Sequence, residues 1–80
     1  MRLKVLTFAQ LREALGAVVE LELPEGASVS QLQALLSERY PDVAALAVSR
    51  LAVNRSYVAD PTQVLAAGDE IALIPPVSGG

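Results

Sequence analysis

The residue types that most often perform chemistry in proteins are absent from this chain. Its 80 residues contain no cysteine and no histidine. This removes disulfides, thiolate catalysis, the usual general base and the commonest metal ligand, so we predict no metal site and no catalysis by the chain alone. The sequence ends in Gly79 and Gly80, and the carboxylate of Gly80 is then the group best suited to chemistry.

Two glutamates that lie close together in the sequence are poor candidates for a catalytic pair. Glu20 and Glu22 alternate with apolar residues, which is typical of the solvent-exposed face of a strand. A catalytic pair of carboxylates needs two different environments, and a single solvated strand face does not provide them. We therefore interpret both glutamates as surface residues.

The charge pattern disfavours nucleic acid as a partner. The formal net charge is −3, and the six basic residues are scattered singly instead of forming a stripe that could neutralise a row of phosphates. With 52% hydrophobic and 19% charged residues, a domain this small must expose some apolar side chains. An exposed apolar patch favours a protein partner.

The sequence also disfavours a membrane location. Residues 1–8 alternate instead of forming an apolar leader, and no run approaches the roughly 18 apolar residues of a membrane span. We predict a soluble, cytoplasmic protein.

The first half of the chain predicts a strand, a short helix and a second strand. Residues 2–8 alternate, which turns Leu3 and Val5 toward the core and leaves Phe8 on the outer face. Residues 9–15 change to helical spacing, and Gly16 is expected to cap that helix in a left-handed conformation. Residues 18–23 return to alternation.

The main helix is predicted to begin at Ser28. Gln31 follows three residues later and completes a capping box, in which each side chain accepts a backbone N–H of the other residue. Pro41 ends the helix. Its apolar stripe should pack into the core and consists of Val29, Leu32, Leu35 and Leu36. Residues 41–46 are expected to form one further helical turn with the proline at its first position.

The second half predicts a hairpin and a last strand. Residues 50–53 and 56–58 pair around an Asn54-Arg55 turn, and an irregular segment follows in which Val64 and Leu65 pack inward. In residues 70–74 the alternation turns Ala72 and Ile74 to the same outer face as Phe8. The fold class is α+β: a four- to five-stranded mixed sheet packed on one long helix, with a short helix after the first strand.

We expect one domain over residues 1–74 and an extended, flexible tail over residues 75–80. Pro75 and Pro76 lack N–H donors, so they end the strand pairing and stiffen the tail, which continues as Val77-Ser78. Gly79 and Gly80 have no Cβ and can pass a narrow channel. Fully extended, six residues reach about 20 Å, enough to enter a partner while the domain stays outside.

Three segments together resemble the small subunits of molybdopterin synthase, a family of ubiquitin-like β-grasp sulfur carriers. They are residues 5–13 (VLTFAQLRE), residues 52–54 (AVN), and residues 68–70 (GDE) leading to the terminal PPVSGG. Their order and spacing extend the resemblance over essentially the whole chain. The biochemical expectations below come from this resemblance and not from periodicity or composition.

The resemblance implies that a ubiquitin-activating-like adenylyltransferase uses ATP to adenylate Gly80, and that a sulfur donor protein then converts it to a thiocarboxylate. The tail would enter the large synthase subunit and donate sulfur to cyclic pyranopterin monophosphate, forming the dithiolene of molybdopterin. No cofactor is expected on this chain itself. The implied assembly is a heterotetramer of two small and two large subunits.

The resemblance also implies a partner interface, formed by Phe8, Tyr57 and Ile74, with polar contacts from Arg12. Family members commonly carry large aromatic residues where this chain has Leu73 and Ile74. We assign no catalytic role to Ser78.

Two alternatives remain open at the level of sequence. One is a sulfur carrier for thiamine thiazole synthesis or tRNA thiolation, which would share the fold and the two terminal glycines. The other is a ubiquitin-like binding module whose tail performs no chemistry.

Overall fold

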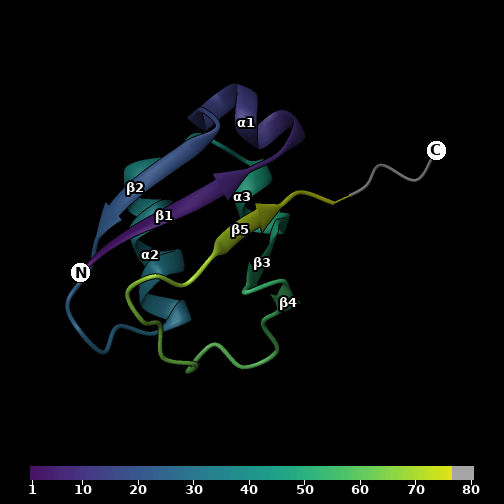
Figure 1. The fold of residues 1–80 in the computed structure, drawn as a ribbon. Helices are drawn as coiled ribbons and strands as arrows, with labels where there is room; N and C mark the ends of the chain where they lie inside the picture. The colour runs from purple at the N-terminus through teal and green to yellow at the C-terminus, as the bar shows by residue number, and fades with distance from the viewer. Residues whose placement is uncertain (77–80) are drawn as a thin grey trace.

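A computed structural model describes residues 1–76 of the chain. Within that range five strands form one mixed sheet with the order β2-β1-β5-β3-β4 (Figure 1). The strands are β1 (Arg2–Thr7), β2 (Val18–Glu22), β3 (Arg50–Val53), β4 (Ser56–Tyr57) and β5 (Ile71–Ile74). The two central strands, β1 and β5, run parallel, and the other neighbours run antiparallel. The predicted mixed sheet is confirmed.

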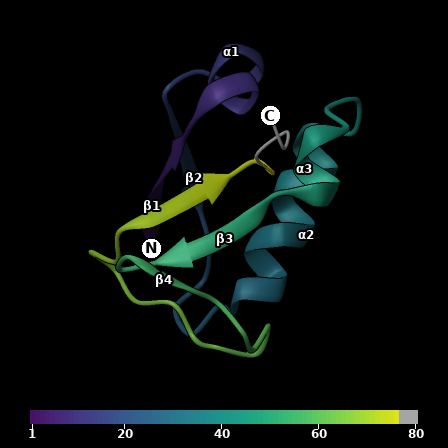
Figure 2. The same cartoon turned by 90° about the vertical axis from the view of Figure 1, so that its right-hand side faces the viewer.

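The longer helix covers one face of this sheet. The helices are α1 (Ala9–Leu15), α2 (Val29–Arg39) and α3 (Ala45–Val48). Figure 2 shows α2 and α3 on the same side of the strands, while α1 lies beyond one end of β1. Over the described part of the chain, the opposite face of the sheet carries no helix, and we call it the open face.

The alternation of each strand decides which side chains reach the core. In β1 the buried residues are Leu3, Val5 and Thr7, as the pattern predicts. Burial also alternates in β2 and β5. The helix-facing side chains of the sheet meet α2 through Val29, Leu32 and Leu36, each no more than 3% exposed. Packing this face of α2 onto the sheet therefore stabilises the fold.

The predicted capping box at the start of α2 is confirmed. The Ser28 backbone N–H donates to Gln31 Oε1 at 2.8 Å, and the Gln31 N–H donates to Ser28 Oγ at 3.3 Å. Two backbone donors that the helix cannot satisfy internally are thus paired, which fixes the first residue of α2.

Replacing Leu36 with alanine should lower the free energy of unfolding by about 2–5 kcal/mol, because the side chain is almost fully buried and leaves a cavity. Leu35, predicted to share the same stripe, is only half-buried, so Leu35→Ala should cost clearly less. Urea unfolding of both variants measures the difference. Equal losses would contradict this account of the core.

The turn after α1 differs in part from its prediction. Gly16 has the expected positive φ of 90°, but its ψ is 164°, so it is extended and not left-handed helical. This conformation is essentially restricted to glycine. Hydrogen bonds to the end of β1 accompany it: the Thr7 hydroxyl donates to the Gly16 carbonyl, and the Thr7 N–H donates to the Ala17 carbonyl at 3.1 Å.

The segment after α2 was predicted wrongly. Residues 41–46 do not form a helical turn that begins at the proline; α3 instead occupies Ala45–Val48. Pro41 lies in a turn, and the hydrogen bonds around it span three residues, as from the Val43 N–H to the Tyr40 carbonyl at 3.3 Å. Hydrogen bonds between residues three positions apart favour successive tight turns over a regular α-helix, whose bonds join residues four positions apart.

The segment between β4 and β5 corrects a second prediction. Leu65 is buried as expected, but Val64 is 63% exposed. Val64 forms an isolated antiparallel bridge with Ser28, and the backbone there is held by bonds such as that from the Val29 N–H to the Gln63 carbonyl at 2.9 Å. Neighbouring residues of an extended segment point to opposite sides, so only one of the two can face the core.

The same segment begins with a turn at Asp60. The hydroxyl and the backbone N–H of Thr62 donate to Asp60 Oδ1 at 2.7 and 2.9 Å. These bonds favour the ionised carboxylate and lower the pKa of Asp60 below its ordinary value of 3.8. Because the folded pKa is the lower one, this contribution to stability is present above the ordinary pKa and is lost as the pH falls through the lowered one.

Candidate functional site

The last strand before the tail, β5, lies in the middle of the sheet. β5 is hydrogen-bonded to β1 on one edge and to β3 on the other, and its last residue, Ile74, lies opposite Arg50. The strand that leads to the tail is therefore held from both sides, which fixes the point from which the tail departs (Figure 1).

Two prolines follow this strand. Proline has no N–H and a fixed φ, so it cannot continue the ladder, and β5 ends at Ile74 as predicted. Pro75 is buried and Pro76 is exposed, so the packing of the domain extends one residue past the strand. Val77, Ser78, Gly79 and Gly80, the residues to which the sequence assigns the tail chemistry, lie outside the described residues.

A continuous strip of apolar side chains crosses the open face. Leu6 of β1 lies opposite Val18 and beside Ala72, and Ala52 connects Ala72 to Tyr57. Partners in register project to the same face of a sheet. These residues form what we call the apolar row: Val18, Leu6, Ala72, Ala52 and Tyr57.

The three apolar residues of the predicted interface share this open face. Tyr57 ends the apolar row and is 50% exposed, and Phe8 is 47% exposed. Ile74 is half-buried and follows Ala72 by two positions on β5. Thr7 and Leu73 form the last pair of β1 and β5, and Phe8 and Ile74 are the residues that follow them in the two chain segments. The geometry groups the three residues, while their role in docking stays a prediction.

Arg12 is placed differently. It is exposed on α1 and is not part of the apolar row. The chain reaches α1 through Ala9, whose φ of 52° is left-handed and costs a non-glycine residue roughly 1–2 kcal/mol. This bend separates Phe8, at the edge of the open face, from the helix that carries Arg12. Nothing in the alternation of β1 predicts it.

Sequence reasoning missed Arg50 as a member of this surface. Its Cζ lies 3.8 Å from the centroid of the Tyr57 ring, within range of a cation–π interaction. It also lies opposite Ile74 on the neighbouring strand. The β3–β4 hairpin brings Arg50 near Tyr57, which is seven positions away, but only the strand order places Arg50 opposite Ile74, which is 24 positions away.

The opposite end of the open face is charged. Arg2 lies 3.4 Å from a carboxylate oxygen of Glu22 and 3.8 Å from one of Glu20, and all three side chains are more than half exposed. The interpretation of Glu20 and Glu22 as a solvated strand face is confirmed. The charged end and the apolar row together give the open face two distinct halves.

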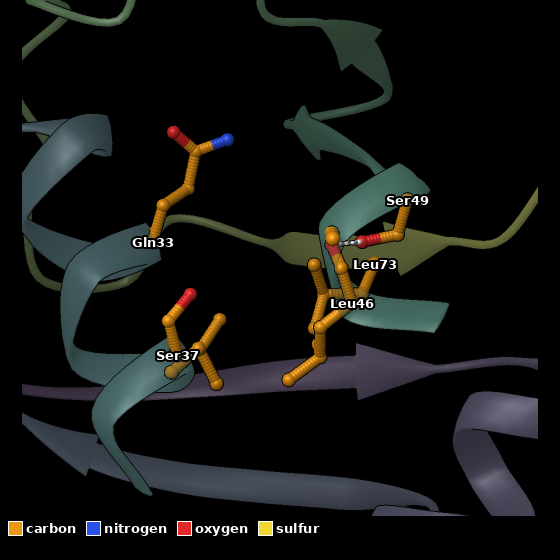
Figure 3. A pocket seen from close by; sticks show the side chains of 7 residues that line it. Gln33, Ser37, Leu46, Ser49 and Leu73 are labelled. Carbon is orange, nitrogen blue, oxygen red and sulfur yellow. Dashed lines mark hydrogen bonds between the residues drawn. The ribbon is translucent and has the colours of Figure 1, made fainter. Parts of the chain in front are cut away.

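A cavity of about 230 Å³ opens on the helix side of the sheet, between α2 and α3 (Figure 3). Gln33 and Ser37 approach it from α2, Leu46 from α3, and Leu73 from β5. The Ser49 hydroxyl donates to the Leu46 carbonyl at 2.8 Å. Among residues 1–76 the lining contains no titratable side chain, so this part of the chain supplies the cavity with no general acid or base.

Residues 1–76 contain no cluster of three or more His, Cys, Asp or Glu side chains that could hold a metal ion. In the same part of the chain no helix has the length and apolar character needed to cross a bilayer.

Comparison with protein families identifies the chain. The model of the ThiS family matches residues 5–80, which includes the whole sheet apart from the start of β1 and extends to the terminal glycines. The chain belongs to the ThiS family. Its solved relatives give this ThiS chain a ubiquitin-like β-grasp fold, in agreement with the fold class predicted from the sequence.

Several relatives of this ThiS chain carry molybdopterin names. The molybdopterin synthase sulfur carrier subunit of Dictyostelium discoideum is 39% identical over 96% of this chain and 94% of its own length. SAMP1 from Haloferax volcanii has a TM-score of 0.82 at 27% identity, covering all of both chains. A complex of subunits 1 and 2 of the molybdopterin-converting factor from Helicobacter pylori contains a similar chain, with a TM-score of 0.76 at 28% identity and full coverage of both.

A hydrogen-bonded clasp fixes the start of β5 in this ThiS chain. Asn54 Nδ2 donates to Asp69 Oδ1 at 3.0 Å, and the Glu70 N–H donates to Asn54 Oδ1 at 2.9 Å. The Asn54 N–H also donates to the Glu70 carbonyl at 2.7 Å. The clasp of Asn54, Asp69 and Glu70 thus ties the β3–β4 turn to the residues that lead directly into β5.

Replacing Asn54 with alanine should lower the free energy of unfolding by about 2 kcal/mol, because it removes the amide bonds and places alanine at a φ of 52°. Asn54→Gly keeps the positive φ and should cost about 1 kcal/mol. Urea unfolding of both variants separates the two contributions. If both lose the same free energy, backbone strain at this turn is not significant.

Proposed function

We propose that this protein is a sulfur carrier of molybdenum cofactor biosynthesis and that its working group is the terminal carboxylate of Gly80. The observation that carries the proposal is the near full-length match to molybdopterin synthase sulfur carrier subunits, such as the Dictyostelium chain at 39% identity. The family match extends to residue 80, which supports the assignment of the chemistry to the terminus.

The chemistry required follows from the properties of a carboxylate. A terminal carboxyl group has a pKa of about 3.3–3.7, so it is ionised at neutral pH and is a poor electrophile. Attack of its oxygen on the α-phosphorus of ATP, with loss of pyrophosphate, gives an acyl adenylate. A sulfur nucleophile can then displace AMP at the carbonyl carbon. The resulting thiocarboxylate donates its sulfur to cyclic pyranopterin monophosphate, and water restores the carboxylate.

The described geometry supports separate roles for the folded domain and the C-terminal tail. The domain, residues 1–74, serves as the handle, and residues 75–80 form the tail, with Gly79 and Gly80 narrow enough to enter a confined site. The tail begins at the central strand of the sheet, which is paired on both edges. A partner that docks on the sheet therefore receives the tail from a fixed position.

Partners supply everything else that the reaction needs. In our proposal the large synthase subunit docks on the open face through Phe8, Tyr57 and Ile74, with Arg12 contacting it from α1. The activating enzyme uses the same face and supplies ATP, and a donor protein supplies sulfur. The large subunit binds the pterin precursor, the assembly is a heterotetramer, and the reactions take place in the cytoplasm. The Helicobacter complex of subunits 1 and 2 supports such a large-subunit partner.

Reconstitution of the last step tests this function. The chain bearing a C-terminal thiocarboxylate should convert cyclic pyranopterin monophosphate to molybdopterin when it is mixed with the large synthase subunit. The same chain with an ordinary carboxylate is the matched control and should give no product. Failure of the thiocarboxylate form to give product, with a large subunit active on another carrier, would favour thiazole synthesis, tRNA thiolation or a binding role.

A second candidate is suggested by the likeness to SAMP1, the small archaeal modifier protein 1 of Haloferax volcanii. An activated Gly80 carbonyl is open to attack by the amine of a lysine as well as by sulfur. The product would be an isopeptide-linked conjugate. Incubation with a cell extract, ATP and the activating enzyme distinguishes the two roles, because conjugates would appear as bands of higher mass that persist under reducing conditions.

A further inference from the structure

Arg50 lies on the open face in contact with one residue of the proposed interface and opposite another. It lies directly opposite Ile74, the last residue before the two prolines, and its guanidinium lies 3.8 Å from the centre of the Tyr57 ring. Two residues of the proposed interface thus flank it. A partner that covers Ile74 and Tyr57 must cover Arg50 as well.

Three of the other four arginines have a polar partner within residues 1–76, and only Arg12 shares with Arg50 the lack of one in that range. Arg2 and Arg55 each have a glutamate within 4 Å, at 3.4 Å to Glu22 and 3.9 Å to Glu70. Arg39 donates to the Glu20 carbonyl at 3.2 Å. By contrast, none of the hydrogen bonds and ion pairs found within residues 1–76 involves the guanidinium of Arg50.

The aromatic ring of Tyr57 prepares Arg50 for binding. A guanidinium above a ring is attracted through its charge and keeps its N–H donors for another acceptor. The interaction also restricts a long side chain that would otherwise lose conformational freedom on binding. Arg50 therefore presents a preorganised, hydrogen-bonding cation beside the start of the tail.

Burial of this cation dictates what the partner must provide. Between Ile74 and Tyr57, docking removes water from the guanidinium, and an unpaired charge at such a site is strongly unfavourable. A carboxylate is the best match, because it can accept two parallel N–H bonds from the planar guanidinium. An apolar partner surface alone would not satisfy Arg50.

We propose that Arg50, held by Tyr57, binds a carboxylate of the large synthase subunit located beside the opening that admits the tail. The inference rests on the proposed function, since it specifies the chemistry of that same docking surface. It adds an ionic contact among the apolar residues of an interface for which the sequence predicts polar contacts only from Arg12, and it sets the orientation of the face as the tail enters.

Titration calorimetry of the chain with the large synthase subunit tests this inference. Arg50→Gln should weaken binding about tenfold, and Arg50→Glu about a hundredfold, because the latter adds repulsion between like charges. Arg50→Lys should recover only part of the loss, since an ammonium does not match a carboxylate with two parallel bonds. Raising the salt concentration should weaken the unmodified chain more than the Arg50→Gln variant.

Arg55→Gln is the matched control. Arg55 lies on the same hairpin and is highly exposed, but it pairs with Glu70, which immediately precedes β5 and so lies at the opposite end of that strand from the start of the tail. Its replacement should change the affinity by less than about twofold. Arg50 is exposed and its contact with Tyr57 contributes little to stability at such a site, so its variants should remain folded and unfold within a few degrees of the unmodified chain.

The outcomes separate this inference from the proposed function. If Arg50→Gln and Arg50→Glu both bind as the unmodified chain does, the ionic contact does not exist and the proposed function stands. Equal weakening by Gln and Glu, with an unchanged salt dependence, would mean that Arg50 only supports Tyr57, which also overturns the inference. If the unmodified chain does not bind the large subunit at all, the proposed function and the inference fail together.

Discussion

Deletion of Gly80 will abolish molybdopterin formation and leave the fold unchanged. The deletion leaves a carboxylate on Gly79, one residue short of the site that the tail must reach, and a residue is worth about 3.3–3.6 Å of extended chain. Because reacting atoms must be positioned within a few tenths of an ångström, such a displacement removes essentially all activity. Molybdopterin production in the reconstituted synthase, with the large subunit in excess, measures the effect.

Two further variants make this prediction specific. Adding one alanine after Gly80 moves the carboxylate in the other direction and should be equally inactive. Ser78→Ala is the tail control and should keep most of the activity, since we assign its hydroxyl no chemical role. The sheet, α2 and the clasp lie upstream of the tail, so all three proteins should unfold at the same temperature. Molybdopterin formation by the deleted chain would refute the mechanism.

Replacement of Phe8 with aspartate should weaken binding to the large synthase subunit by about a hundredfold or more. A large apolar side chain at the centre of an interface commonly contributes several kcal/mol, and a carboxylate in its place would be buried without a partner. Phe8 is 47% exposed and precedes α1 as its N-cap, where aspartate is favoured, so the domain should still fold. Calorimetry with the large subunit measures the affinity, and Ile74→Asp provides a second test on the same face.

The chain offers a matched control for this substitution. Val64 is an apolar residue that is even more exposed, at 63%, but it lies in the segment between β4 and β5 and is not part of the apolar row. Val64→Asp should bind the large subunit as the unmodified chain does. Unchanged affinity in Phe8→Asp and Ile74→Asp, or equal loss in Val64→Asp, would mean that the partner uses another surface.

Much of the fold could be predicted because local patterns decide it. Alternation in β1 and β5 assigns Leu3 and Ile71 to the core and Phe8 and Ile74 to the open face, and burial agrees. The Ser28 and Gln31 pair fixes the start of α2 by bonds that span only three residues. Each of these features depends on neighbours close in sequence.

The features that escaped prediction depend on how distant segments meet. The parallel pairing of β1 with β5 connects residues 66 positions apart, and no periodicity encodes it. The place of Arg50 opposite Ile74 also requires the strand order. Val64 is predicted to pack inward together with Leu65, but it forms a bridge with Ser28 and its side chain is 63% exposed. At this position the backbone pairing decides the direction of the side chain, and the apolar character of valine does not.

The candidate site was predicted by elimination and then by resemblance. The lack of cysteine and histidine directs attention to the terminal carboxylate, but it does not say what is attached there. The identity of the reaction came from a family resemblance of residues 5–13, 52–54, 68–70 and 75–80, and physical chemistry alone does not supply it. Where the structure adds most is at the start of the tail, with β5 in the middle of the sheet and Arg50 beside it.

The most direct measurement of the central claim is the intact mass of the chain after incubation with its activating enzyme, ATP and a sulfur source. We predict an increase equal to the difference between one sulfur and one oxygen atom, located by fragmentation on the C-terminal residue Gly80. Omission of ATP should leave the mass unchanged. If no mass increase appears with several sulfur donors, while the same enzyme modifies another carrier, Gly80 does not carry sulfur and the account is wrong.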